Sequence, residues 1–412
     1  MNKSSNFVFP LIIKKYTYKI IKSFSKISVK YFNINVYRFF IILTILFTYN
    51  NLCICELDAT KKTVNVGIIL NTSAFTTGSS KGFFILDASN KKLKFTKGNI
   101  RIFCSEEGVC VGKHILSLPL KIESLNGIIF ADSNPYRGYL IVKKIKNKIN
   151  IINVLPIEDY LKGVLPMEVG SNWCIEALKT QAVASRTYSI ANLNKHSNPD
   201  QGFDICSTTH CQVYGGAKVE VDSCNKAILE TQCEVLVYDG KLAQAVFHAN
   251  CGGHTENPKY IWNWKYIPPY LKGVKCDYCY DSPHAKWESS IDEIFIRKKL
   301  SNNNIGKIKN IKVKEKMPTG TAKELEILHS NGKLSINAYE FRLIIDAWQI
   351  KSHDFNFIKL DGNKFYFKGN GWGHKVGLCQ WGAKNMAEKG KTYKQILNYY
   401  YPETKVERIT YK

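Results

Sequence analysis

The sequence predicts an α+β fold, in which an N-terminal antiparallel β-rich region precedes a mixed α/β region with long structured loops. Three observations support this prediction. Short β-branched or aromatic runs, separated by turn signals, occupy residues 60–152. A helical pattern of apolar residues follows at 156–195. Residues 251–287 are rich in Gly, Pro, His and aromatic residues and show little periodicity, which is typical of structured loops.

We divide the chain into residues 1–55, 60–152 and 153–412. Residues 1–55 contain eight Lys or Arg and no acidic residue, and end in the uncharged stretch 39–55. Its strongly apolar core is shorter than the roughly 20 residues of an ordinary spanning helix, and it suits a signal peptide. No small-residue cleavage triplet precedes Cys53 or Cys55, so an uncleaved membrane anchor is the alternative. Both interpretations predict an exported protein, periplasmic or extracytoplasmic, that is secreted or membrane-anchored.

The net charge of +24 is compatible with nucleic acid, anionic lipid or an anionic polymer such as cell-wall glycan. No zinc-finger spacing, RNP-like aromatic motif or Arg-rich arm is present, which argues against nucleic acid as a partner. Much of the excess is Lys in an Asn-, Ile- and Lys-rich composition, so a general compositional effect explains it better than any one partner.

The thirteen cysteines favour disulfides between close pairs if the protein is exported. Cys104 and Cys110 flank a short Gly-containing loop. Their spacing resembles that of a hairpin staple, that is, a disulfide that joins the two strands of a hairpin. Cys276 and Cys279 form a CDYC motif. In a cytosolic protein this motif would indicate zinc or redox chemistry, whereas here a local disulfide or pairing with other cysteines is as compatible.

Residues 60–152 read as a β domain of about ninety residues that serves for packing or as a substrate platform. After it, a short helix starts at Glu158 and ends before Pro166. A well-marked helix then begins with Ser171 as N-cap and continues through Arg186. Glu168 is thus predicted on a loop held by a rigid helix, a common setting for a catalytic acid, although a surface turn residue is the simpler interpretation.

The rest of the chain alternates between helices and strands. We expect a helix near 219–230, a hairpin turning at Asp239–Gly240, helices near 291–300 and 338–348, and two helices after a glycine-rich loop at the C-terminus. The glycine-rich loop lacks the GK[ST] of a phosphate-binding loop.

Seven motifs in order carry a family resemblance. They read DYLKGVLPMEV, EALKTQAVASRTY, FDICSTTHCQVYGG, AVFHANCGGHTE, PYLKGV, SPHAKW and GWGHKVGLCQWGA. The chain resembles the stage II sporulation protein D family, also described as the amidase enhancer or LytB family, over roughly residues 60–410. The resemblance implies activity on peptidoglycan, as a lytic transglycosylase that cleaves glycan strands often stripped of peptides by an amidase. It does not imply a sporulation role.

The resemblance also implies site residues. The catalytic glutamate corresponds to Glu168, a functional arginine to Arg186, and a tyrosine–lysine pair to Tyr270 and Lys272. A helix from Ser171 to Arg186 would place its ends about 22 Å apart, so Arg186 could orient the fold rather than touch the reacting bond.

A sugar-binding cleft would suit four further motif residues, His248, His254, His374 and Gln380. For the histidines, structural hydrogen bonding in tight loops is an equally weighted alternative. The motif at His374 departs from the usual glycine–histidine–glycine pattern because Lys375 follows it, and Cys379 stands where a small hydroxyl residue is usual.

The resemblance requires no cofactor but allows a structural zinc ion, which some family members bind through cysteines and a histidine. Cys206, His210 and Cys211 lie within six residues. Cys206 and Cys211 match the family's cysteines, and His196 is the nearest upstream histidine.

A lytic transglycosylase needs one carboxylate, since the sugar's own 6-hydroxyl is the nucleophile, whereas most glycosidases use two. Its acid must be protonated near neutral pH, which requires apolar cover. The sequence therefore predicts a peptidoglycan-remodelling lytic transglycosylase with glycan strands, a cell-wall amidase and the membrane as partners. The alternative is a non-catalytic, peptidoglycan-binding enhancer of an N-acetylmuramoyl-L-alanine amidase.

Overall fold

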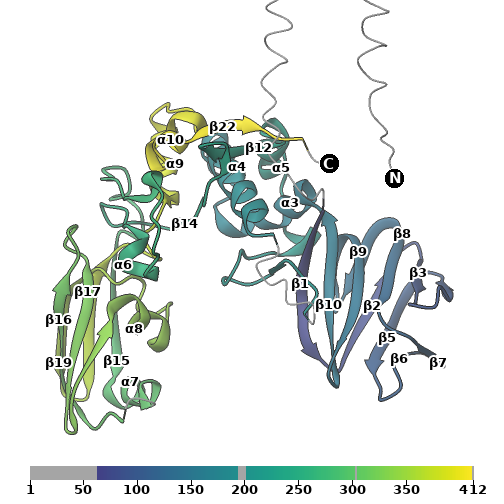
Figure 1. The fold of residues 1–412 in the computed structure, drawn as a ribbon, viewed down its shortest axis with the longest axis horizontal. Helices are drawn as coiled ribbons and strands as arrows, with labels where there is room; N and C mark the ends of the chain where they lie inside the picture. Colours follow the sequence, from purple (N-terminus) through teal and green to yellow (C-terminus); the bar gives the residue numbers. More distant parts are fainter. Residues whose placement is uncertain (1–62, 194–200, 302–303, 411–412) are drawn as a thin grey trace, which may run out of the picture. The chain divides into compact units, whose positions relative to one another are not determined.

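A computed structural model describes residues 63–193, 201–301 and 304–410 (Figure 1). The predictions made for residues 1–55 lie outside this part of the chain. Among the described helices, none has both the length and the apolar character needed to cross a membrane.

The first half of the described chain forms one large sheet. Its strands are β1 (Thr63–Thr72), β2 (Ala74–Ser79), β3 (Phe83–Leu86), β4 (Lys92–Phe95), β5 (Gly98–Cys104), β6 (Val109–Val111), β7 (His114–Leu116), β8 (Leu120–Ala131), β9 (Asn134–Ile145), β10 (Lys148–Pro156) and β11 (Ile205–Cys206). The strand order is β11-β1-β10-β9-β8-β2-β5-β6-β7, with β3 pairing β8 and β4. All the pairs are antiparallel except β1–β11, so the predicted antiparallel β-rich region is confirmed.

The centre of this sheet is covered on both faces. Strand β10 is buried along nearly its whole length, which explains its continuous apolar sequence INIINVL. Ile149 and Ile151 belong to the main core, whereas Ile152 and Val154 pack against Phe203 and Cys206 on the other side. The segment that contains Cys206 is therefore fixed to the sheet.

The expected staple between Cys104 and Cys110 is not formed, because the two side chains lie on opposite faces of the hairpin. Strands β5 and β6 do pair as a hairpin, with Phe103 opposite Cys110 and Cys104 opposite Val109. Residues opposite each other share a face and neighbours along a strand alternate. Both thiols are accordingly free.

Three helices pack beside the sheet: α3 (Ile157–Glu168), α4 (Ile175–Ala191) and α5 (Asp222–Glu230). The predicted end of the first helix was wrong, because α3 continues through Pro166 to Glu168. The predicted start of the second was also wrong. Val169 is extended and α4 begins after Cys174, so Ser171 lies in the turn between the helices.

The remaining core elements are short. They are η1 (Gly216–Val219), β12 (Glu234–Tyr238), β13 (Lys241–Leu242), β14 (Phe247–His248), α6 (Pro258–Trp262), η2 (Pro269–Leu271), β21 (Leu378–Cys379), α9 (Gln380–Glu388), α10 (Tyr393–Tyr400) and β22 (Lys405–Arg408). The hairpin predicted at Asp239–Gly240 is confirmed, and both residues have positive φ as a type I′ turn requires. Strand β14 pairs with β21 in parallel, which joins segments 131 residues apart, as Phe247 pairs with Leu378.

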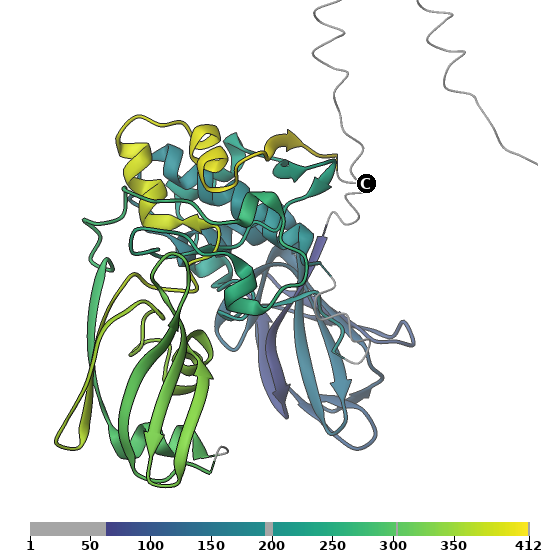
Figure 2. The same cartoon turned by 60° about the vertical axis from the view of Figure 1, so that its left-hand side comes forward.

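Residues 286–370 have a hydrophobic cluster of their own. They contain β15 (Lys286–Asp292), α7 (Glu293–Lys299), β16 (Ile308–Lys316), β17 (Ala322–His329), β18 (Gly332–Asn337), α8 (Ala338–Ile345), β19 (Phe355–Asp361) and β20 (Lys364–Asn370). These strands form two three-stranded sheets, β15-β20-β19 and β16-β17-β18, which Figure 2 shows in green and yellow-green. The sequence interpretation treated this segment as an undivided part of 153–412.

Candidate functional site

A pocket of about 820 Å³ brings together residues from distant parts of the sequence. Glu168 from the end of α3 and Tyr188 and Asn192 from α4 line it, with the loop 208–213. Its remaining walls come from Gln244, Val246, Phe247, Trp262, Trp264, Tyr339, Leu343 and His374. Glu168, predicted as catalytic, His374, predicted to bind substrate, and Cys211, predicted as a metal ligand, all line this pocket. The sequence did not predict that Trp262, Trp264, His210 and the α8 residues line it as well.

The position of Glu168 depends on a close approach between α3 and the segment Gln212–Gly216. A Cβ on Gly163 would lie 2.5 Å from the Tyr214 ring, so the glycine permits this contact in mid-helix. The Gly215 amide donates to the Gly163 carbonyl at 2.9 Å. The Val213 amide then donates to Glu168 Oε1 at 3.1 Å. The packing of one glycine therefore delivers a backbone donor to the carboxyl group.

Buried hydrogen bonds fix the same segment from the other side. The Tyr214 hydroxyl donates to Asn153 Oδ1 on β10 at 2.8 Å. The Ser189 hydroxyl on α4 donates to Gln212 Oε1 at 2.6 Å. Sheet and helix together hold the wall of the pocket that faces Glu168.

Burial raises the pKa of Glu168 from 4.5 to about 7, and the hydrogen bond from Val213 opposes the rise. Near neutral pH the carboxyl therefore exists in both its protonated and its ionised form, while it lines an accessible pocket. A carboxylic acid with this pKa can donate a proton at neutral pH and accept one afterwards.

The sulfur and imidazole donors of loop 206–211 lie close together. The Cys206 and Cys211 sulfurs are 3.3 Å apart, and His210 Nδ1 lies 3.7 Å from the first and 3.5 Å from the second. Thiolates and imidazole are donors that zinc prefers, so this set fits the ion. In the structure, His210 is the histidine that lies beside Cys206 and Cys211. The predicted histidine, His196, lies outside the described residues.

Arg186 lies away from the pocket. Its side chain is fully buried and donates to both Glu158 oxygens at 2.9 and 2.8 Å, and to the carbonyls of Glu234 and Ile228. These contacts join α3, α4, α5 and β12. The structure thus gives this arginine a positioning role in the fold.

Tyr270 and Lys272 occupy different environments. Tyr270 is buried, and its hydroxyl oxygen accepts from the amide of the pocket residue Gln244 at 2.9 Å. Lys272 is exposed and does not line the pocket. Tyr270 therefore supports the pocket wall from behind, and Lys272 is not brought to the carboxyl group.

The four residues predicted to bind sugar also separate. His374 lines the pocket and packs against Trp262, with ring centres 4.9 Å apart. His248 is buried behind it, with Nδ1 3.0 Å from the Val376 carbonyl, and burial lowers its pKa to about 4. His254 bonds the adjacent Thr255 carbonyl, and Gln380 donates to Gln181 Oε1 at 3.3 Å in the core. Burial also lowers the pKa of His374 well below its usual value, so the pocket imidazole is neutral.

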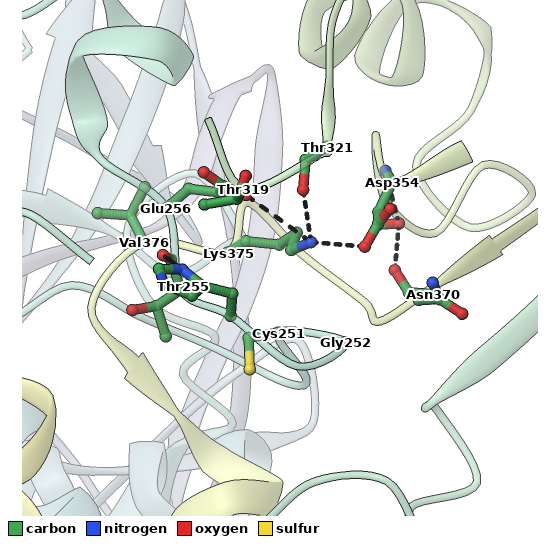
Figure 3. Close-up of polar contacts among 12 residues, drawn as sticks. Cys251, Gly252, Thr255, Glu256, Thr319, Thr321, Asp354, Asn370, Lys375 and Val376 are labelled. Atoms are coloured by element: carbon green, nitrogen blue, oxygen red, sulfur yellow. Dashed lines mark hydrogen bonds and ion pairs between the residues drawn. The ribbon is translucent and has the colours of Figure 1, made fainter. Parts of the chain in front are cut away.

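Lys375, which follows His374, is a buried cation (Figure 3). Its Nζ donates to Asp354 Oδ2 at 2.7 Å and to Thr321 Oγ1 at 2.9 Å, and Glu256 Oε1 lies 3.9 Å away. Lys375 has φ of 64°, where a glycine would be less strained. The ion pairs hold this loop against 286–370 and so fix the position of His374.

Comparisons with known proteins match two separate regions of the chain. A family model described as stage II sporulation protein matches residues 145–238, and a model described as a domain of unknown function matches 281–377. An uncharacterised protein of Brachyspira hyodysenteriae is 35% identical over 280 residues, which cover 68% of this chain and 72% of that protein.

Two Bacillus subtilis proteins are also similar. Its amidase enhancer is 30% identical over 295 residues, covering 59% of this chain and 40% of the enhancer. Its stage II sporulation protein D is 29% identical over 270 residues, covering 61% and 74%. The pocket is therefore lined both by the matched region 145–238 and, through Tyr339, Leu343 and His374, by the second matched region.

Proposed function

Because the chain belongs to the stage II sporulation protein D and amidase enhancer family, we propose that it is a peptidoglycan lytic transglycosylase. Its substrate is the glycan strand, free of peptides, and its role is cell-wall remodelling or division. The single observation that supports this proposal best is the buried carboxyl of Glu168 in an aromatic-lined pocket, where burial raises its pKa to about 7.

In the proposed reaction Glu168 acts first as an acid. Its carboxyl proton moves to the glycosidic oxygen as the bond from that oxygen to the anomeric carbon breaks. The resulting carboxylate then takes the proton of the same sugar's 6-hydroxyl, whose oxygen bonds to the anomeric carbon. A 1,6-anhydro ring forms, Glu168 recovers its proton and no water is consumed. One group performs both transfers, so a pKa of about 7 suits both.

The pocket walls would bind the strand. Trp262 and Trp264 lie with ring centres 5.3 Å apart, and flat apolar faces of this kind suit sugar rings. The neutral imidazole of His374 can hydrogen-bond a hydroxyl without adding charge beside the acid.

We propose that Cys206, Cys211 and His210 hold a structural zinc ion. The ion would fix the loop that continues into Val213, whose amide contacts Glu168. It would supply no step of the reaction. The basic and apolar composition of residues 1–55 supports an exported, membrane-anchored or secreted location.

The second candidate is a non-catalytic glycan-binding protein that stimulates a cell-wall amidase. The name of the Bacillus subtilis amidase enhancer favours it. The two candidates share the pocket but differ in whether Glu168 transfers a proton.

The test is Glu168→Gln, with Glu123→Gln as a control, because Glu123 is a surface residue on β8 paired with Lys121. We expect Glu168→Gln to reduce the formation of 1,6-anhydro ends on peptide-free strands by about 10²- to 10⁴-fold while glycan binding persists. The control variant should match the parent. Products are measured by mass spectrometry of the released glycans.

Equal rates of 1,6-anhydro-end formation by the parent and Glu168→Gln would refute the proposed enzymatic activity. A parent that makes no anhydro ends on any glycan but accelerates a purified amidase would establish the second candidate instead.

A further inference from the structure

Four cysteines outside the pocket form a closed group in the core. Cys251, Cys276, Cys279 and Cys379 are all buried, and their sulfurs all lie within 4.8 Å of one another. They come from three separate segments: the CGG loop after β14, the CDYC motif, and the end of β21. A single disulfide would join only two of these cysteines, so it does not explain why all four thiols lie together.

The spacing of the sulfurs fits a single tetrahedral ion. With zinc–sulfur bonds of about 2.3 Å, neighbouring sulfurs in a tetrahedron are about 3.8 Å apart. The Cys251 and Cys279 sulfurs are 3.6 Å apart. All four lie too close together to surround an iron–sulfur cluster, and a soft four-sulfur set selects zinc among the common divalent ions.

Hydrogen-bond donors surround these sulfurs as they do around metal-bound thiolates. The Cys251 amide donates to the Cys379 sulfur at 3.3 Å, and the Tyr400 hydroxyl lies 3.1 Å from the Cys276 sulfur. Such outer contacts stabilise the negative charge of the ligands and orient them.

We propose that Cys251, Cys276, Cys279 and Cys379 bind one structural zinc ion. All four positions of the ion are filled by protein, as in a closed structural zinc site, and none of the four residues lines the pocket. The proposal is independent of the reaction assigned to Glu168.

The place of this site in the chain suggests what the ion does. The second matched region begins at residue 281, two residues after Cys279, and ends at 377, two residues before Cys379. Cys251 belongs to the core that precedes it. One ion would therefore join the entry and the exit of residues 281–377 to the core. The same segment supplies His374, Tyr339 and Leu343 to the pocket, so the ion would hold one pocket wall in place.

The test uses the full chain and separates the two cysteine groups. In Cys206→Ser/Cys211→Ser the four core cysteines remain, and we expect one tightly held zinc per chain by elemental mass spectrometry. After exchange with Co²⁺, this variant should show the sulfur-to-cobalt charge-transfer and tetrahedral d–d bands of four thiolates. Cys276→Ser/Cys279→Ser should lose one zinc relative to the parent, and Cys104→Ser/Cys110→Ser should retain the parent's content.

The cobalt spectrum decides the question even if Cys276→Ser/Cys279→Ser fails to fold. The proposal is overturned if Cys206→Ser/Cys211→Ser holds no zinc, if it holds iron instead, or if its cobalt spectrum lacks the thiolate bands. It is also overturned if peptide mapping of the exported protein finds the four thiols joined as two disulfides.

Discussion

The two ends of helix α3 carry glutamates in opposite surroundings. Glu158, in the first turn, receives two hydrogen bonds from the buried guanidinium of Arg186. Glu168, the last helical residue, receives a backbone amide and, within the described residues, forms no ion pair. The first carboxylate is neutralised by a cation and stabilises the fold. The second has no such cation, and burial raises its pKa to about 7 against the opposing hydrogen bond from Val213, as the proposed acid requires.

Removal of Arg186 should have the largest effect on stability. Arg186→Met removes the guanidinium that pairs with the partly buried carboxylate of Glu158, and it removes one hydrogen-bond donor from each of the Glu234 and Ile228 carbonyls. Breaking a buried pair by removing one partner costs about 3–5 kcal/mol of the free energy of unfolding. Urea denaturation followed by circular dichroism measures the loss.

Lys162→Met is the matched control, because Lys162 pairs with Asp159 on the same helix but both side chains are partly exposed. It should cost less than about 1 kcal/mol. Similar losses for the two variants would show that the Arg186 pair is not the stabilising end of α3.

At the other end of α3, the ionised carboxylate of Glu168 lowers the free energy of unfolding instead of raising it. Burial raises the pKa of Glu168 from 4.5 to about 7, so the folded protein keeps this proton to a higher pH than the unfolded chain does. The stability that it contributes is complete below pH 4.5 and is lost as the pH rises through about 7. Glutamine cannot ionise, so the free energy of unfolding of Glu168→Gln should exceed the parent's by a margin that grows by about 2 kcal/mol between about pH 5 and pH 8.

Chemical denaturation of both proteins across this pH range gives the margin, with Glu123→Gln as the surface control. A margin that does not change with pH would mean that the Glu168 carboxyl is ionised in the folded protein throughout.

Local sequence patterns predicted the elements whose conformation depends on residues that are close in sequence. The turn at Asp239–Gly240 is confirmed because positive φ is a property of those residue types. The β-rich region is confirmed because side-chain alternation and turn residues are local signals. The extension of α3 through Pro166 was missed because tertiary packing outweighs the proline's lost hydrogen bond.

The site depends on contacts that no local pattern contains. Cys104 and Cys110 are close in sequence, yet the register of β5 and β6 places them on opposite faces. Cys276 and Cys279 showed half of the proposed ligand set in the sequence. The pairing of β14 with β21 brings Cys251 toward Cys379, and the hydrogen bond from the Cys276 amide to the Gly253 carbonyl brings the CDYC motif to the same loop. Glu168 was identified by its motif, whereas its raised pKa follows from the pocket that the fold builds around it.

The smallest effect that we predict concerns the pocket walls. If the pocket end of α3 serves ligand binding rather than stability, its aromatic residues should affect the two properties unequally. Trp262 is partly exposed at the end of α6 and packs on Trp264 and His374. Trp262→Ala removes apolar area that a sugar ring would cover, which we expect to weaken glycan binding roughly tenfold, equivalent to about 1.4 kcal/mol.

Binding is measured by isothermal titration of peptide-free glycan strands in the Glu168→Gln background, so that no turnover occurs. Trp348→Ala is the control, because Trp348 is 70% exposed and lies outside the pocket lining. Equal weakening by both substitutions would indicate that the strand binds a broader surface than the pocket. Unchanged binding by Trp262→Ala would remove this wall from the proposed glycan site, and the contrast between the two ends of α3 would then rest on Glu168 alone.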